Sequence, residues 1–371
     1  MGSEKQDLSL KAFRDEIDRI DHQILSLLFE RLTQVDQISQ WKASKGIPIK
    51  DQLREKEKIG ALTKNLSDSD AKWVESIFQE IMRQSKLYQS KPGVSTLKGS
   101  VSIIGLGLMG GSLYKAIRHY HPLIEVKPFD IRSDIDAPLV SLNEALGSEY
   151  IFLCLSPHQI KEFLKQHGEK IFHESTVIDF ASTKSDIANF VFSYKKFKFN
   201  FIPAHPIVGK ESSGYEHSDV DLYLNKKIVI CDDEEQLPKL LKEVLLGIGL
   251  KIKHMNTEDH DQSLAFTSHL PHLIALALVL SSEQQLKKDI VPQSFLDLTR
   301  ISDASSSLWQ DIFTSNQHYL TLAVNEFNRV LIDLLNNVDR LKDAYNKAKE
   351  IKKECLDDHS SQEIPFKKPA A

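Results

Sequence analysis

The stretch VSIIGLGLMGGSL, Val101–Leu113, decides the fold of the middle of the chain. A short run typical of a buried strand leads into Gly105, Gly107 and Gly110, spaced as GxGxxG, and a helical pattern follows them. A strand, a tight glycine turn and a helix in this order open a parallel α/β sheet that binds a dinucleotide. We therefore expect a doubly wound, Rossmann-like domain built around this turn.

The residues of the turn suit the pyrophosphate of a nicotinamide dinucleotide. The glycines let the backbone approach the anion, and Leu108 and Met109 open the helix whose first amides face it. Asp130 ends the next strand about twenty residues later, where a carboxylate accepts hydrogen bonds from the adenine ribose and repels a 2′-phosphate. The sequence therefore predicts NAD rather than NADP, a preference that the neighbouring Arg132 moderates.

The residues before the turn have the pattern of helices. Apolar residues recur at steps of three and four over residues 8–45, which predicts one long amphipathic helix. Gly46 and Pro48 end this helix, a second helix covers residues 51–66, and Asp70 caps a third.

The period of the pattern changes after the third helix. Strand-like runs alternate with helical stretches, which is typical of a parallel sheet; they read VSIIG, IEVKPFD, EYIFLCLS, STVIDFAS and KFNFIPAH. From about residue 257 the pattern is helical again. We expect a multidomain protein: an all-α three-helix module (1–92), a linker (93–99), a Rossmann-like α/β domain (100–255) and an all-α C-terminal domain (256–360).

The composition excludes several classes of protein. The 371 residues carry a net charge of only −5, and Lys and Arg are spread along the chain, which argues against nucleic acid as a partner. The three cysteines are far apart, as expected in a reducing compartment. The N-terminus has no apolar leader, and the most apolar run, Leu270–Leu280, is shorter than a bilayer span. We expect a soluble cytoplasmic protein with no membrane partner.

His205 is the candidate catalytic base. It ends a buried strand, at the edge where α/β sheets collect ligands, and a neutral imidazole there can take a carbinol proton while hydride leaves for nicotinamide. Ser182, after the preceding strand, is placed to assist it. His269 and His272 lie one turn apart without a nearby acidic ligand, so we expect no metal site. Arg300 would matter for a carboxylate substrate.

Several motifs together resemble the prephenate/arogenate dehydrogenase family: GLGLMGGS, DFASTK, AHPIVGKESSG, SHLPH and DLTRI followed by LWQDIF. The resemblance spans nearly all of residues 100–350 and implies oxidative decarboxylation of prephenate to 4-hydroxyphenylpyruvate with NAD. It implies that His205 deprotonates the ring hydroxyl, that Ser182 assists, and that Arg300 holds a carboxylate. Further positions that match the family's substrate site are Glu211, His272, Asp297 and Trp309.

Two departures from this family's pattern affect the rim of the pocket. The chain reads VPQSFLDLTR where a glycine-rich stretch and a basic residue usually precede the aspartate, and Lys210 stands where a small or hydroxyl residue is common. An arogenate dehydrogenase is therefore the first alternative. A general hydroxyacid dehydrogenase is another, detectable as activity on simple 3-hydroxy acids.

The long first helix carries cations on a core-like pattern. Arg31 and Lys42 are eleven residues apart, about three turns, so they share one face. Arg14 lies about 25 Å before Arg31 and about a quarter-turn round, so it cannot reach the same small ligand from the same chain. One anion that contacts all three would require a dimer with intertwined helices. From spacing alone, a solvated charged face is the stronger interpretation.

The arrangement LKAFRDEIDRID, LLFER, WK, DQLRE and SKLYQ resembles the all-α chorismate mutase family over residues 8–90. The resemblance implies a pocket that rearranges chorismate to prephenate without an acid, base or nucleophile, in which arginines grip two carboxylates and Arg14 comes from the other subunit. Lys42 and Gln89 would donate to the ether oxygen, and Glu55 would bind the ring hydroxyl. The full set of matching positions is Arg14, Arg31, Lys42, Asp51, Arg54, Glu55, Ser85 and Gln89.

The two resemblances describe consecutive steps. We expect a bifunctional enzyme of tyrosine biosynthesis that is dimeric through both helical modules, with chorismate and prephenate as substrates. A further alternative makes the N-terminal module a non-catalytic dimerisation or effector-binding unit.

Overall fold

The computed structural model of the chain describes residues 2–45, 52–89, 95–209, 213–232, 237–284 and 286–360. The chain forms two compact units, one of Met1–Lys91 with Lys352–Ala371 and one of Pro92–Ile351. Asp51, Lys210 and Glu211 lie outside the described residues, as do the side chains of Lys42 and Gln89.

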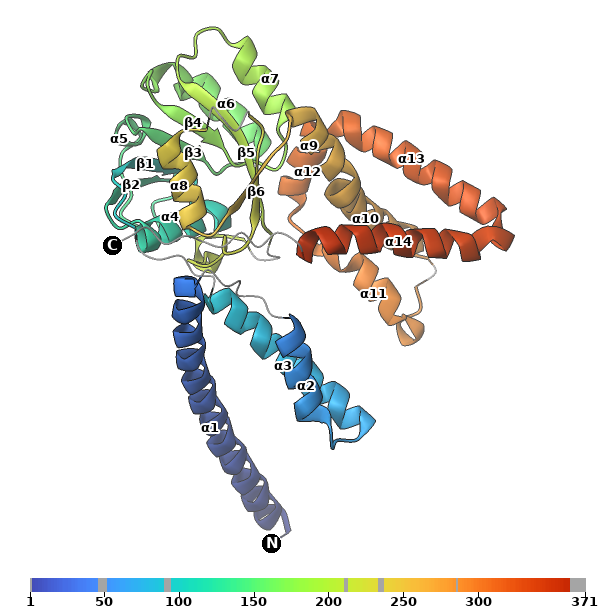
Figure 1. Cartoon of the computed structure of the whole chain (residues 1–371). Helices are drawn as coiled ribbons and strands as arrows, with labels where there is room; N and C mark the ends of the chain where they lie inside the picture. The colour runs from blue at the N-terminus through green and yellow to red at the C-terminus, as the bar shows by residue number, and fades with distance from the viewer. Residues whose placement is uncertain are drawn as a thin grey trace. The chain divides into compact units, whose positions relative to one another are not determined.

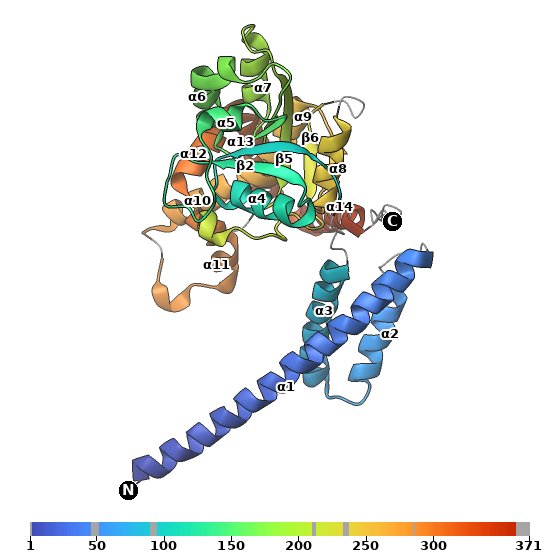
Figure 2. The same ribbon diagram turned by 90° about the vertical axis from the view of Figure 1, so that its left-hand side faces the viewer.

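The first unit contains three helices, as the periodicity predicts. They are α1 (Gly2–Lys45), α2 (Gln52–Thr63) and α3 (Asp68–Gln89), and both α1 and α2 pack against α3. The cap of α3 differs from the prediction, because Asp70 lies inside the first turn and its backbone N–H donates to Ser67 Oγ. Figure 2 shows that α1 runs on past α2 and α3. Its apolar residues in that stretch are therefore exposed, among them Phe13 (69%) and Ile17 (55%).

The second unit is built on a seven-stranded sheet with the order β2-β1-β3-β4-β5-β6-β7 (Figure 1). All neighbouring strands are parallel except β5 and β6, which pair antiparallel. The strands are β1 (Gly99–Ile104), β2 (Ile124–Phe129), β3 (Tyr150–Leu153), β4 (Thr176–Asp179), β5 (Asn200–Ile207), β6 (Lys227–Ile230) and β7 (Lys251–His254). The first five match the five predicted runs. β6 and β7 were not among the predicted strands; each is only four residues long, and their sequences are KIVI and KIKH.

Helices cover both faces of this sheet, and each face has its own buried core. α4 (Leu108–Tyr120) and α8 (Lys239–Gly247) supply one core, while α5 (Leu142–Leu146), α6 (Pro157–His167) and α7 (Ser185–Ser193) supply the other. The five-residue α5 is the only helix between β2 and β3. Because the chain moves from β2 back across β1 to β3, the carboxyl ends of β1 and β3 form the switch point at which such sheets bind ligands.

A series of helices follows β7. They are α9 (Thr257–Leu264), the π-helical turn η4 (Ala265–His269), α10 (Leu270–Ser282), α11 (Gln293–Thr299), the short η6 (Arg300–Asp303), α12 (Ser306–Ser315), α13 (Gln317–Asn336) and α14 (Leu341–Ser360). Two of them, α9 and α12, contact α7 and α6 of the sheet domain. Two side-chain hydrogen bonds join α12 to the sheet domain, Ser156 Oγ to Asp311 Oδ2 (2.5 Å) and Thr183 Oγ1 with Ser315 Oγ (2.8 Å).

The apolar run of α10 belongs to a longer helix than the sequence analysis expected. Thr257–Ser282 is continuous over 26 residues and, by length and composition, apolar enough to cross a bilayer. However, it contains buried polar side chains, His260, Asp261 and His269, that are hydrogen-bonded within the protein. Polar groups placed in this way are typical of a helix packed on a protein core.

Candidate active sites

The glycine turn has the geometry of a pyrophosphate site. Gly105 has a φ of +91°, which disfavours any residue with a side chain. A Cβ at Gly110 would lie 1.9 Å from the carbonyl oxygen of Gly105, so only glycine lets the helix pack this close to the strand. A Cβ at Gly107 would meet no atom of the described residues within 4 Å, which leaves open space at the N-terminus of α4. No side chain caps that terminus, so its first amides are available to an anion.

Asp130 lies at the adjacent strand end and contacts the same turn. Its Oδ2 accepts a hydrogen bond from the backbone N–H of Leu106 (2.7 Å), and its Oδ1 accepts one from the backbone N–H of Arg132 (2.9 Å). Each carboxylate oxygen keeps a further lone pair for a ribose hydroxyl. The residues present therefore fit the adenosine half of a dinucleotide, and Asp130 also fixes the turn that would hold its phosphates.

His205 occupies the sixth position of β5, three strands from β1 in the sheet. Strands are spaced at about 4.8 Å, so the two strands are about 14 Å apart, a separation that an extended dinucleotide can span. Ser182 follows β4, whose last residue, Asp179, pairs with Pro203 of β5. The register therefore brings the loop with Ser182 and the strand with His205 to the same edge of the sheet.

Behind His205 lies a chain of hydrogen bonds that the sequence analysis did not anticipate. His205 Nδ1 contacts His260 Nε2 at 3.0 Å, and His260 Nδ1 contacts Asp261 Oδ1 at 2.8 Å. The partly buried His205 belongs to the sheet, whereas His260 and Asp261 belong to α9 and are almost completely buried. No described residue forms a hydrogen bond with His205 Nε2, so this atom is available to a ligand.

Asp261 connects this chain to the helix after β4. Its Oδ1 also accepts from the backbone N–H of Lys184, and its Oδ2 accepts from the backbone N–H of Ser185, both at 2.8 Å. Asp261 thus caps α7 from a different domain, since α7 has no side-chain cap of its own. The amide of Asn316 donates to the Asp261 carbonyl (2.8 Å) and lies 3.0 Å from His269 Nδ1.

The pKa shifts in this region favour a neutral His205 and an ionised Asp261. Burial, reinforced by the nearby His260, Lys184 and His269, lowers the pKa of His205 well below its usual value. Burial by itself would raise the pKa of Asp261, but the hydrogen bonds from His260 and from the backbone amides of α7 outweigh it, and the pKa is lowered. The site can therefore provide a neutral base next to a fixed negative charge.

Lys184 holds the strand below His205. Its ammonium forms a fully buried ion pair with Asp179 (2.5 Å) and donates to the carbonyl oxygen of Ala204 (2.9 Å). A buried pair of this kind, with its remaining donor on a carbonyl, fixes geometry more than it adds stability. Lys184 is the last residue of the DFASTK motif. The sequence gives no direct signal that His260 and Asp261 lie next to His205.

The remaining predicted substrate residues lie on the C-terminal helices. The His272 ring stacks on Trp309 with centroids 3.5 Å apart, so these two predicted residues do meet. Asp297, on α11, accepts from Gln293 Nε2 (2.9 Å), and Arg300 follows it as an exposed residue at the start of η6. Ser182 forms no hydrogen bond with any residue in the described ranges.

In the first unit, the structure brings Arg31 of α1 and Ser85 of α3 together. Arg31 Nη1 donates to Ser85 Oγ, which in turn donates to the carbonyl oxygen of Ile81 (2.6 Å). The Arg31 Nε is buried without a hydrogen-bond partner among the described residues, and burial lowers the pKa of this guanidinium. A buried N–H without an acceptor is unfavourable, and a bound anion would supply the missing acceptor.

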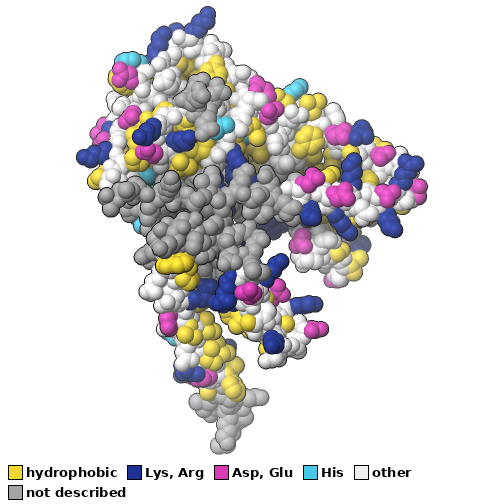
Figure 3. Space-filling model, viewed as in Figure 1, with side chains coloured by type: hydrophobic (Ala, Val, Ile, Leu, Met, Phe, Trp, Pro, Cys, Tyr) yellow, Lys and Arg dark blue, Asp and Glu magenta, His cyan; other side chains and the backbone are white. Residues whose placement is uncertain are grey.

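The other predicted mutase residues within the described ranges lie on the same three helices. Arg14 is exposed in the part of α1 that extends past its neighbours, Arg54 of α2 is exposed beside Glu57 (3.7 Å), and Glu55 is partly buried. Apolar side chains gather along α1 in the space-filling view (Figure 3). The members of this exposed stripe are Leu10, Phe13, Ile17, Ile20 and Ile24.

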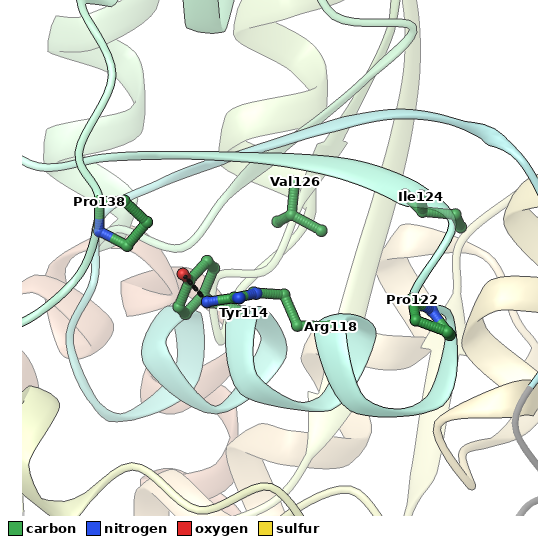
Figure 4. Close-up of a pocket in the computed structure, with 6 residues that line it drawn as sticks. All are labelled: Tyr114, Arg118, Pro122, Ile124, Val126 and Pro138. Carbon is green, nitrogen blue, oxygen red and sulfur yellow. Dashed lines mark hydrogen bonds between the residues drawn. The ribbon is translucent and has the colours of Figure 1, made fainter.

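A hollow of about 360 Å³ lies elsewhere, between α4 and the edge strand β2 (Figure 4). The Arg118 guanidinium donates to the hydroxyl of Tyr114 (2.7 Å) within it. Ile124, the first residue of β2, also lines it, so the hollow lies toward the amino end of that strand. The glycine turn and His205 are at the carboxyl ends of their strands, so this hollow belongs to neither candidate site.

Three family models match successive parts of the chain. Chorismate mutase type II matches residues 13–90, the nucleotide-binding domain of prephenate dehydrogenase matches 132–254, and the dimerization domain of prephenate dehydrogenase matches 256–351. The second match begins after the glycine turn and Asp130, so the geometry described above is independent support for nucleotide binding.

Individual relatives agree with these matches. Prephenate dehydrogenase of Lactococcus lactis subsp. cremoris is 31% identical over 63% of this chain and 70% of its own, and the T-protein of Enterobacter agglomerans is 23% identical over 86% of each chain. The crystal structure of A. aeolicus prephenate dehydrogenase in complex with hydroxyphenyl propionate and NAD+ has a TM-score of 0.62 and 27% identity, and covers 71% of this chain and 99% of that one. The chain therefore belongs to the prephenate dehydrogenase family and joins a type II chorismate mutase domain to the two dehydrogenase domains, as a bifunctional enzyme of tyrosine biosynthesis.

Proposed function

We propose that His205 is the general base of the dehydrogenase step. The observation that carries this role is the hydrogen-bonded chain from Asp261 through His260 to His205 Nδ1, together with an Nε2 that has no hydrogen bond to a described residue. The proton of the ring hydroxyl of prephenate moves to His205 Nε2 as hydride leaves the ring carbon that bears this hydroxyl for the nicotinamide. The bond between the ring and its carboxylate then breaks and CO₂ departs, while the electron pair of that bond completes the aromatic ring. The oxygen on the opposite ring carbon takes back the proton from His205 Nε2 and becomes the hydroxyl of 4-hydroxyphenylpyruvate.

The other dehydrogenase residues act in binding. Ser182, at the same edge of the sheet, supports the hydroxyl of the substrate, and Arg300 pairs with a carboxylate. His272, Trp309, Asp297 and Glu211 surround the substrate. Asp130 selects NAD through the ribose diol, and Gly105, Gly107, Leu108, Met109 and Gly110 form the turn on which the pyrophosphate is held.

The mutase site binds one dicarboxylate with cations from two chains. Arg31, whose Nε has no acceptor among the described residues, grips one carboxylate together with Arg54, and Ser85 holds the Arg31 guanidinium. Arg14 comes from a second copy of the chain, because about 25 Å of helix separates it from Arg31. Lys42 and Gln89 donate to the ether oxygen, while Glu55 and Asp51 bind hydroxyl groups or orient the cations.

A homodimer explains the exposed apolar stripe of α1. Exposure of a row of apolar side chains to water is unfavourable, and a second copy of the chain would cover them. These side chains are Leu10, Phe13, Ile17, Ile20 and Ile24. The apolar surface of the helix Thr257–Ser282 has the same need in a domain that matches a dimerization family. We place the enzyme in the cytoplasm, where Cys154 and Cys231 stay as free thiols.

One cuvette tests both activities. Purified enzyme receives chorismate, whose absorbance should fall as prephenate forms, and NAD+ is then added, after which NADH should appear. Arogenate replaces prephenate in a parallel run, and a higher kcat/KM for arogenate would reassign the substrate. Unchanged chorismate together with no NADH from prephenate would refute the proposal.

A further inference from the structure

The hydrogen bonds behind His205 determine where its proton lies. An ionised carboxylate only accepts hydrogen bonds, so His260 Nδ1 must carry the proton that points to Asp261 Oδ1. In a neutral His260 the other nitrogen, Nε2, is then an acceptor. Because His260 Nε2 lies 3.0 Å from His205 Nδ1, the proton between these two atoms belongs to His205 Nδ1.

A neutral imidazole carries one ring proton. With that proton on Nδ1, the Nε2 of His205 has a free lone pair, and Nε2 is the atom with no hydrogen bond to a described residue. The opposite tautomer, with Nε2 protonated, would set two acceptors against each other at 3.0 Å or require His260 to release Asp261. Both leave a buried polar group without its hydrogen bond, which is unfavourable.

The rest of the network keeps this polarity in place. Asp261 is held by two backbone amides of α7 as well as by His260, and Asn316 holds its carbonyl. The other charges that face the two rings are Lys184 and Asp179, which neutralise each other, and the neighbouring titratable groups are His269 and Cys231. Asp261 is therefore the charge available to stabilise a protonated His205.

We propose that His260 and Asp261 are positioning residues that hold His205 in the tautomer whose Nε2 accepts the hydroxyl proton of the substrate. This inference rests on the proposed role of His205 as the base. During the reaction the proton moves from the substrate oxygen to His205 Nε2, the Nδ1 proton stays hydrogen-bonded to His260, and the negative Asp261 stabilises the imidazolium through His260. The arrangement differs from a direct pair of histidine and carboxylate because a second imidazole lies between them.

The first test measures the tautomer in the wild-type enzyme. Nitrogen-15 NMR of histidine-labelled protein distinguishes a protonated ring nitrogen from an unprotonated one, and the spectrum of His205→Asn identifies the His205 signals. We expect a protonated Nδ1 and an unprotonated Nε2 at pH 8. A protonated Nε2 in wild-type enzyme would overturn the proposal, whatever the variants do.

Variants of His260 provide the second test. His260→Phe removes the acceptor, and we expect kcat for prephenate oxidation to fall about 100-fold while the prephenate KM and the NAD+ Kd change less than twofold. In His260→Gln the side-chain oxygen can accept from His205 Nδ1, so we expect it to recover at least about a tenth of the wild-type kcat. A folded His260→Phe variant that keeps the wild-type kcat and the wild-type tautomer of His205 would refute the positioning role of His260 and Asp261.

Ser315→Ala is the matched control. This variant removes the hydrogen bond of Ser315 with Thr183, which joins the same two domains. It leaves the hydrogen bonds among Asp261, His260 and His205 intact. We expect its kcat and its His205 signals to stay at wild-type values, and a loss equal to that of His260→Phe would show that domain docking, and not the tautomer, matters. If His205→Asn keeps normal NADH production, the proposed role of His205 as the base fails. This result is distinct from failure of the positioning role of His260 and Asp261, which the His260 variants test.

Discussion

The proposed mutase and dehydrogenase sites are built in opposite ways. In the mutase domain, Arg31 and Arg14 lie on one helix about 25 Å apart, Arg14 is exposed, and the buried Nε of Arg31 has no acceptor in the described part of the chain. In the dehydrogenase, His205, His260 and Asp261 form contacts of 3.0 Å or less within one chain. A rearrangement without proton transfer needs only well-placed charges, which two subunits can share, whereas proton transfer needs a ring of defined tautomer, which requires a buried network.

The largest expected effect is the loss of one activity without the other in a variant of His205. His205→Asn should lower the dehydrogenase kcat by about 10³-fold, because an amide cannot take the hydroxyl proton. Mutase activity should be unchanged, since the proposed pocket of that reaction lies on α1, α2 and α3. Both rates are measured on one preparation, and NADH production above a tenth of the wild-type rate would contradict the assignment of the base.

Arg31→Ala should give the reverse pattern. We expect the mutase rate to fall about 10²-fold or more, with no change in the dehydrogenase rate, because the partly buried guanidinium is the proposed ligand of a substrate carboxylate. Arg83→Ala is the matched control, since Arg83 is exposed on α3 and paired with Glu80 (2.6 Å). Equal losses in the two variants would mean that helix stability, and not substrate binding, is affected.

Mixing two inactive chains sharpens the comparison further. Arg14→Ala and Arg31→Ala variants, unfolded and refolded together, should recover about a quarter of wild-type mutase activity, because half of the dimers are heterodimers with one intact pocket of two. No recovery, with heterodimers verified by mass spectrometry, would place Arg14 outside a shared pocket.

Acid should affect the stability of the dehydrogenase half through its buried histidines. Burial lowers the pKa of His269 from 6.5 to about 4, and it also lowers the pKa of His205. Between pH 6.5 and about pH 4, His269 binds a proton in the unfolded chain but not in the folded chain. The free energy of unfolding therefore falls as the pH falls. For His269 the loss between pH 7 and pH 5 is about 2 kcal/mol. Urea unfolding at both pH values measures it; His269→Gln should reduce the pH dependence, whereas the exposed His173→Gln should not.

The smallest expected effect concerns the choice of cofactor. Asp130→Asn replaces a charged acceptor beside the ribose, and we expect NAD+ binding to weaken about tenfold while discrimination against NADP+ decreases, because Arg132 remains. Fluorescence titration with each nucleotide gives the two Kd values. Asp134→Asn, an exposed position in the same loop, should bind both as wild type does. An unchanged ratio of the two Kd values in Asp130→Asn would remove Asp130 from the selection of NAD.

Local patterns predicted the elements whose signal lies within a few neighbouring residues. The three N-terminal helices, five strands and the turn at Gly105 follow from periodicity and from the conformational freedom of glycine. β6 and β7 were missed because four residues, KIVI or KIKH, are too few to establish a strand pattern. Ser67 as the cap of α3 was also missed, since Asp70 carries the same capping chemistry three residues later.

For the active sites, the sequence by itself determined the chemical types: a glycine turn followed by an aspartate, a histidine at a strand end, and cations on one helix face. Only the tertiary structure decided that His260 and Asp261, 55 and 56 residues after His205, complete its hydrogen bonds. The physical reason is range. Helix and turn formation depend on neighbours within about four residues, whereas a buried polar group must find its partner wherever packing brings the chain, and that position is a property of the folded whole.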